Sequence, residues 1–125
     1  MFSHIVVGSN DLDKSKTFYD AVFGAIGGNP GMTMPGRLMY PHNGSNFMVV
    51  TPINGEPATH ANGGTIGFTM SPEQADAWHA AGVAAGGATC EDPPGVREAP
   101  FGKMYLAYLR DPDGNKLCAF HMMGQ

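Results

Sequence analysis

Residues 3–27 read SHIVVGSNDLDKSKTFYDAVFGAIG, which is a strand signal followed by a helix signal. The β-branched run at residues 4–7 is typical of a short strand. Residues 9–11 (Ser-Asn-Asp) then supply side chains that cap a helix N-terminus. The apolar residues that follow recur at spacings of three and four, so they share one face of a helix that the glycines from Gly24 onward end. This stretch predicts a strand and an amphipathic helix.

The same order occurs twice along the chain. After the first helix, two strands are predicted over residues 37–40 and 47–51, and the Asn-Gly pair within residues 42–44 (His-Asn-Gly) favours a hairpin turn between them. The second half repeats the pattern about sixty residues later, with a Ser-Pro-Glu-Gln capping box before its helix. Its expected strands cover residues 65–69, a poor loop-like stretch at 88–91, and a hairpin of 104–109 and 116–121.

The two repeated units are expected to pack together, because one unit of this length cannot bury both faces of its sheet. We therefore predict an α+β fold of two βαβββ modules, about residues 1–52 and 63–123, within a single domain spanning residues 1–125. Residues 52–64 contain Pro, Gly and Asn without periodicity and read as the linker.

Composition excludes several classes of function. The 125 residues carry a net charge of −4 with no clustered basic run, which argues against nucleic-acid binding. No apolar run approaches the roughly 20 residues of a membrane span, and the N-terminus lacks the pattern of a signal peptide. The two cysteines are too few for a disulfide framework, so a reducing cytoplasmic location is expected.

The two ends of the chain resemble a known family. Residues 3–27 look like the opening strand and helix of the glyoxalase/bleomycin-resistance/extradiol dioxygenase (vicinal oxygen chelate) superfamily. Residues 108–120, YLRDPDGNKLCAF, look like its closing hairpin. The resemblance implies that the modules curl into a half-barrel cavity that binds a small molecule. It also implies a homodimer, because such cavities are often completed across a two-fold interface.

The same resemblance implies four metal-ligand positions, and this chain fills them poorly. His4 matches a ligand position, whereas the others fall on Met48 or Val49, Thr65 and Cys118. One imidazole and one soft sulfur do not make a preformed site for a divalent ion. A divalent metal is therefore possible but disfavoured, no metal ligand is assigned, and His4 remains as a candidate catalytic or polar cavity residue.

Several residues are candidates for ligand contact. The glycine-rich stretch with His60 and Asn62 reads either as a substrate clamp or as a flexible linker. Met104 and Tyr108 share one strand face by alternation, and Tyr105 and Leu109 should face the covering helix. The full substrate-binding set comprises His60, Asn62, Thr65, Met104, Tyr108 and Cys118.

Other polar residues have less specific expectations. His42 is expected in a solvated turn. Asp111 and Asp113 are expected to hydrogen-bond the backbone of the turn that contains them. The chain's arginines are Arg37, Arg97 and Arg110, and the sequence does not choose which of them would meet an anionic substrate.

Two functions remain open. The first is a lyase or isomerase that acts on a small carbonyl or thiol-adduct substrate without the usual metal set. It lacks a positioned carboxylate base at the matched positions. The second is a non-catalytic protein of the resistance type, which sequesters a small molecule and needs only a lined cavity. Fold alone does not decide between them.

Overall fold

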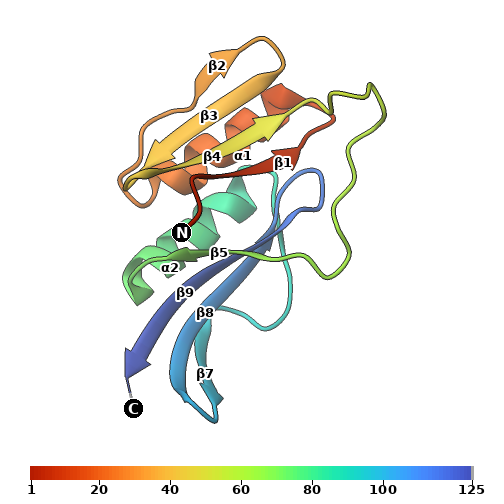
Figure 1. Ribbon diagram of the computed structural model, residues 1–125. Helices are drawn as coiled ribbons and strands as arrows, with labels where there is room; N and C mark the ends of the chain where they lie inside the picture. The colour runs from red at the N-terminus through yellow and green to blue at the C-terminus, as the bar shows by residue number, and fades with distance from the viewer. Residues whose placement is uncertain (125) are drawn as a thin grey trace.

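The computed structural model describes residues 1–124, and its first half folds as one βαβββ module. The elements are β1 (His4–Gly8), α1 (Leu12–Gly24), β2 (Met32–Met34), β3 (Arg37–His42) and β4 (Ser45–Val50). The strands form a sheet in the order β1-β4-β3-β2, in which β1 runs parallel to β4. Figure 1 shows α1 lying across one face of this sheet. The short strand β2 was not anticipated.

The second half repeats the arrangement with one strand in two pieces. Its elements are β5 (Ile66–Thr69), α2 (Pro72–Ala84), β6 (Ala88–Thr89), β7 (Gly95–Ala99), β8 (Gly102–Arg110) and β9 (Lys116–Gly124). β5 pairs with β9 and β9 with β8, while β6 and β7 both pair with β8. β6 faces Leu109–Arg110 and β7 faces residues 102–106, so residues 90–94 loop out between the two pieces.

Local sequence signals explain where the elements begin and end. The Asp11 carboxylate caps α1 by accepting from two backbone N–H groups, and Ser71 and Gln74 form the expected capping box at α2. Asn43 and Gly44 have φ values of 49° and 88°, which is the backbone of a tight hairpin turn. Several expectations needed adjustment in the second half. β5 begins one residue after Thr65, the poor strand at 88–91 shrinks to two residues, β7 was not expected, and both strands of the last hairpin are longer than expected.

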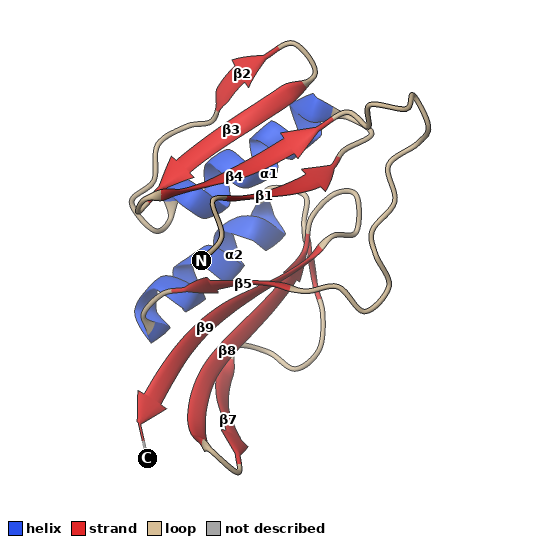
Figure 2. Ribbon diagram, viewed as in Figure 1, coloured by secondary structure: helices blue, strands red, loops and turns tan. Residues whose placement is uncertain are grey.

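One core serves both modules. The two helices lie on the same side of the sheets and contact each other (Figure 2). Phe18 and Val22 of α1 lie so close to Gly82 of α2 that a Cβ there would be 3.2 Å and 3.0 Å from their side chains. The Tyr19 hydroxyl donates to Asp111 of the second module at 2.5 Å. The modules therefore meet through their helices.

Strand alternation leaves one face of each sheet turned away from the helices, which we call the outer face. Val7 and Val49 of the first sheet and Leu117 and Ala119 of the second belong to the buried core. Their sequence neighbours consequently point to the outer faces. No helix among residues 1–124 is long and apolar enough to cross a membrane.

Candidate functional site

The outer face of the second sheet gathers three of the residues expected to contact a ligand. Tyr108 lies directly opposite Cys118 across the β8–β9 pair, and Met104 lies two rows further along the same face. Cys118 is also the parallel neighbour of Gly67 on β5. On the helix side of β8, the Tyr105 hydroxyl donates to Asp76 of α2 at 2.6 Å. The alternation expected along this strand is therefore present.

A charged group lies beside Tyr108. Lys116 forms an ion pair with Glu91, and its Nζ lies 5.0 Å from the centroid of the Tyr108 ring. Arg97 on β7 donates to the carbonyls of Asp92 and Pro93 at 3.0 Å and 2.9 Å. Three strands (β7, β8 and β9) and the 90–94 loop thus bring together cations, a carboxylate and an aromatic ring.

Part of this charged group could have been found in the sequence. Lys116 lies two residues before Cys118 on one strand, so alternation alone places both on one face. Glu91 offered no such signal, because its position depends on the loop that interrupts the pairing of β6 and β7 with β8. Sequence reasoning missed Glu91 for that reason.

The Cys118 thiol is not activated. Burial raises its pKa, and the hydrogen bond with Tyr108 opposes that effect only in part. The residue is 6% exposed. Burial, together with the nearby Cys118 and Glu91, also raises the pKa of Tyr108. Because the thiolate is the reactive form of cysteine, this environment favours a neutral thiol that lines the face.

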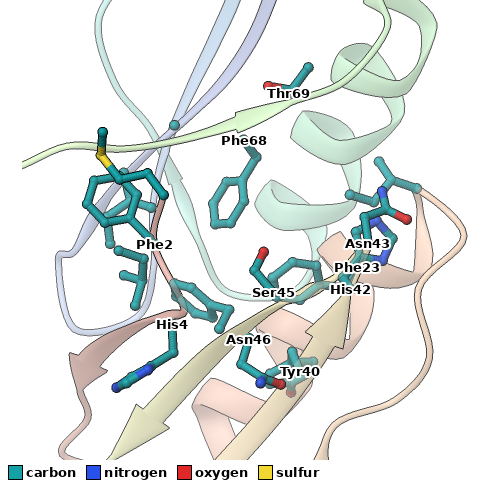
Figure 3. Close-up of a pocket in the computed structure, with 16 residues that line it drawn as sticks. Phe2, His4, Phe23, Tyr40, His42, Asn43, Ser45, Asn46, Phe68 and Thr69 are labelled. Atoms are coloured by element: carbon teal, nitrogen blue, oxygen red, sulfur yellow. The ribbon is translucent and has the colours of Figure 1, made fainter.

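A cavity of about 430 Å³ lies between the two sheets, where it is lined by residues of β1 and β5. Phe68 of β5 approaches Phe23 and Phe47, with ring centroids 5.7 Å and 5.6 Å apart. His42 also lines the cavity, half-buried with its ring 6.2 Å from Phe23, so the expectation that it is solvated was wrong. In Figure 3 the His4 ring points away from Phe68, although His4 lines this cavity.

A second cavity, of about 290 Å³, lies between the end of β1 and the start of β5. It is lined by His60 of the linker and by Lys116 at the start of β9. The His60 ring packs on the hairpin turn, because a Cβ on Gly114 would lie 2.7 Å from its Nδ1. Asn62 and Thr65 are exposed and line neither of these two cavities.

Asp111 bonds the backbone of its turn as expected, whereas the expectation for Asp113 was wrong, because its carboxylate bonds the first module instead. Asp111 is 4% exposed and accepts from the backbone N–H groups of Asp113 and Asn115, both at 2.9 Å. Asp113 accepts from the backbone N–H of Asn10 in the first module at 2.9 Å. The Asp111 carboxylate therefore holds the turn, and both carboxylates join it to the first module.

The residues at the family's metal positions do not fit a divalent ion. The register decides the one ambiguity: Met48 pairs with Val6 on the face of His4, while Val49 is fully buried against the helix. The donors are then one imidazole, a thioether, a hydroxyl and a thiol. No carboxylate is among them and burial raises the pKa of the thiol, so the imidazole is the one good ligand for a hard or borderline divalent ion. Within residues 1–124 no three His, Cys, Asp or Glu side chains are grouped to hold an ion.

The duplicated βαβββ order and the shared helical core define an α+β protein of the half-barrel class. The chain belongs to the Glyoxalase/Bleomycin resistance protein/Dioxygenase superfamily, whose family model matches residues 1–119. The resemblance of the two terminal stretches is confirmed by this match.

Solved structures agree with this assignment. The crystal structure of a glyoxalase/bleomycin resistance protein from Albidiferax ferrireducens T118 is 60% identical, with a TM-score of 0.93, and the match covers 97% of this chain and 98% of that one. A glyoxalase-related enzyme from Fulvimarina pelagi is 23% identical, with a TM-score of 0.74 over 96% of this chain and 86% of its own. That second likeness concerns the fold alone. A comparison with curated proteins finds no match.

Proposed function

We propose that the protein binds a small organic molecule on its outer sheet faces, and that binding does not depend on a divalent metal. The observation that carries this proposal is the pair of Tyr108 and Cys118 on the second sheet, with the Lys116 ammonium over the Tyr108 ring. Such an arrangement combines an aromatic wall with a few polar groups, the usual composition of a ligand site. Met104 extends the apolar part, and His60 adds a polar group at the cavity that Lys116 also lines.

A second candidate function is a lyase or isomerase reaction on a small carbonyl or thiol-adduct substrate. One observation favours it, namely that the Glu91 carboxylate lies on the same face as Tyr108 through its ion pair with Lys116. A carboxylate in that place is a possible proton acceptor, which the metal-ligand positions do not supply. Sequestration needs fewer conditions, and we place binding before catalysis.

We also propose that two copies of the chain cover each other's outer faces. The first sheet exposes apolar side chains on that face, with Val6 at 46% and Met32 at 50% exposure. A two-fold pair would bury them and close the ligand site between subunits. Light scattering coupled to size exclusion should then give about twice the 13.2 kDa chain mass.

The proposal can be tested with a neutral aromatic probe, naphthalene-2-carboxamide, added to ¹⁵N-labelled protein while amide shifts are followed by NMR. We expect the largest shifts on β8 and β9, and we expect Tyr108→Ala to weaken binding. Val96→Ala is the matched control, because Val96 is 49% exposed and its pairing with Tyr105 places it on the opposite face. Shifts confined to other elements, or none at all, would refute the proposed site.

Independence from metal needs its own measurement. Elemental analysis of purified protein should find no stoichiometric metal, and Ni, Zn, Fe and Mn should leave the thermal midpoint unchanged. His4→Ala should behave as the parent does in this assay. One bound ion per chain that is lost in His4→Ala would contradict this part of the proposal.

A further inference from the structure

Positive charge gathers on the outer faces of a chain that is acidic overall. The net charge is −4. Yet the ionised side chains at outer-face strand positions of residues 1–124 are cationic, as their pairing shows. They are Arg37, Arg97, Arg110 and Lys116. A surface of this sign attracts anions and repels cations.

The carboxylate of Glu91 neutralises part of this charge through its ion pair with Lys116. It comes from the 90–94 loop, at the point where the edge strand leaves Ala107 and Tyr108 of β8 without a partner from β6 or β7. Glu91 adopts a left-handed backbone with φ of 57°, which is uncommon for a residue other than glycine or asparagine. Such conformations and interrupted edge strands recur at binding sites.

The ion pair is open to exchange with solvent. The Glu91 side chain is 48% exposed and that of Lys116 is 21% exposed. Lys116 also lies over the Tyr108 ring, and Arg97 holds the loop through the carbonyls of Asp92 and Pro93. Another carboxylate can therefore reach Lys116 without opening the core.

We propose that the ligand of this site is a small organic anion with an apolar, ring-sized body, and that its acidic group displaces Glu91 from Lys116. This inference rests on the proposed function and names the ligand class for the same face. The anionic group would lie between Lys116 and Arg97, and the ring would lie against Tyr108. Glu91 thus occupies the position of the ligand's acidic group while the site is empty.

Competition between Glu91 and the ligand makes a specific prediction. Removing the Glu91 charge should strengthen binding of an anion, because Lys116 then has no internal partner. The expected gain is about fivefold, the scale of one exposed ion pair. Removing the charge of Lys116 or Arg97 should weaken binding of the anion by a similar factor. A neutral ligand of the same shape should respond to none of these changes.

The experiment compares naphthalene-2-carboxylate with naphthalene-2-carboxamide by NMR titration of the full chain. The two probes share a ring system and differ in charge. We expect the parent protein to bind naphthalene-2-carboxylate more tightly than the carboxamide. Glu91→Gln should widen this difference in affinity, and Lys116→Met and Arg97→Met should narrow it. Raising the salt concentration should narrow it as well.

A matched control lies on the same hairpin. Lys103 and Glu98 form an ion pair at 3.8 Å, with side chains 60% and 75% exposed, on the opposite face of β7 and β8. Glu98→Gln and Lys103→Met change the net charge by the same amounts and should not alter the ratio of affinities.

The outcomes separate the two proposals. Equal affinities for the two probes would overturn the anion inference, and so would a ratio of affinities that Glu91→Gln does not change. Neither result would contradict the proposed binding site. A ratio that Glu98→Gln shifts equally would also overturn it, because net charge would then be the cause. Failure of both probes to shift β7–β9 would overturn the proposed site and the anion inference together.

Discussion

The two βαβββ modules share an order of elements but contribute different side chains to the helix contact. α1 presents large aromatic residues, including Phe18 and Tyr19, both fully buried. α2 buries Trp78 as well as the small Ala75 and Gly82, and the chain after it continues with Gly87 against the Phe18 ring. At Gly82 and Gly87 the large residues of α1 fit the space that a missing side chain leaves. At these two positions the repeats are therefore complementary parts of one core.

The outer faces of the modules differ in the same way. That of the first sheet is mainly apolar, with Val6 opposite Met48 and Arg37 at the start of β3. That of the second carries Tyr108, Cys118 and the Glu91 ion pair. The first module thus has an apolar face that could cover a ligand site, and the second module has polar groups that could contact a ligand.

The largest effect on stability is expected from filling the space that the second module leaves for α1. A Cβ on Gly87 would lie 2.3 Å from the Phe18 ring, and 2.9 Å and 3.0 Å from two backbone carbonyl oxygens, which cannot move freely. Gly87→Ala should lower the free energy of unfolding by about 3 kcal/mol, the upper part of the range for overpacking. Urea denaturation followed by circular dichroism measures this.

The control comes from the other module. Gly24 ends α1, and a Cβ there would meet nothing within 4 Å. Gly24→Ala should leave stability unchanged or raise it by up to about 1 kcal/mol, the helix-propensity difference. Equal effects of Gly24→Ala and Gly87→Ala would contradict the complementary packing.

A smaller effect is expected from the hydrogen bond that joins the modules. Tyr19→Phe removes the donor to Asp111 while keeping the ring, and the Asp111 carboxylate is nearly inaccessible to water. We expect a loss of about 1–2 kcal/mol, since a buried acceptor loses a partner. Tyr40→Phe breaks a bond to Asp20, a partly exposed carboxylate within the first module, and should cost less. Thermal unfolding of the two variants gives the comparison, and a larger loss for Tyr40→Phe would contradict it.

The smallest effect concerns acid stability. Burial alone would raise the pKa of Asp20, but the N–H of Gly31, the Lys16 ammonium and the Tyr40 hydroxyl outweigh it and hold the pKa below its usual value. A lowered pKa stabilises the fold above the unfolded pKa, near 4, and that stability is lost as the pH falls through the folded pKa. The stability gap between the parent protein and Asp20→Asn should therefore shrink between about pH 6 and about pH 3.

Urea midpoints at the two pH values measure this gap. Lys16→Met should reproduce only part of the effect, because the bonds from Gly31 and Tyr40 remain. A gap that stays constant with pH would show that the Asp20 charge does not contribute.

Local sequence signals predicted both helices and most of the strands, although not β2 or β7. Capping side chains such as Asp11 and Ser71, and the Asn43-Gly44 turn, act on residues a few positions away, so their effect can be read locally. Strand alternation likewise puts Tyr108 and Met104 on one face, because side chains an even number of residues apart on a strand point to the same side.

The tertiary structure decided what gathers around those residues. Glu91 reaches Lys116 because β6 and β7 share one edge of β8 and leave a loop between them. The Pro93-Pro94 pair signals the break locally, but no local pattern encodes which distant residue Glu91 meets. His42 is half-buried because α1 brings Phe23 against it. In both cases the partner is distant in the chain, and long-range pairing depends on how the whole core packs rather than on the preference of one segment.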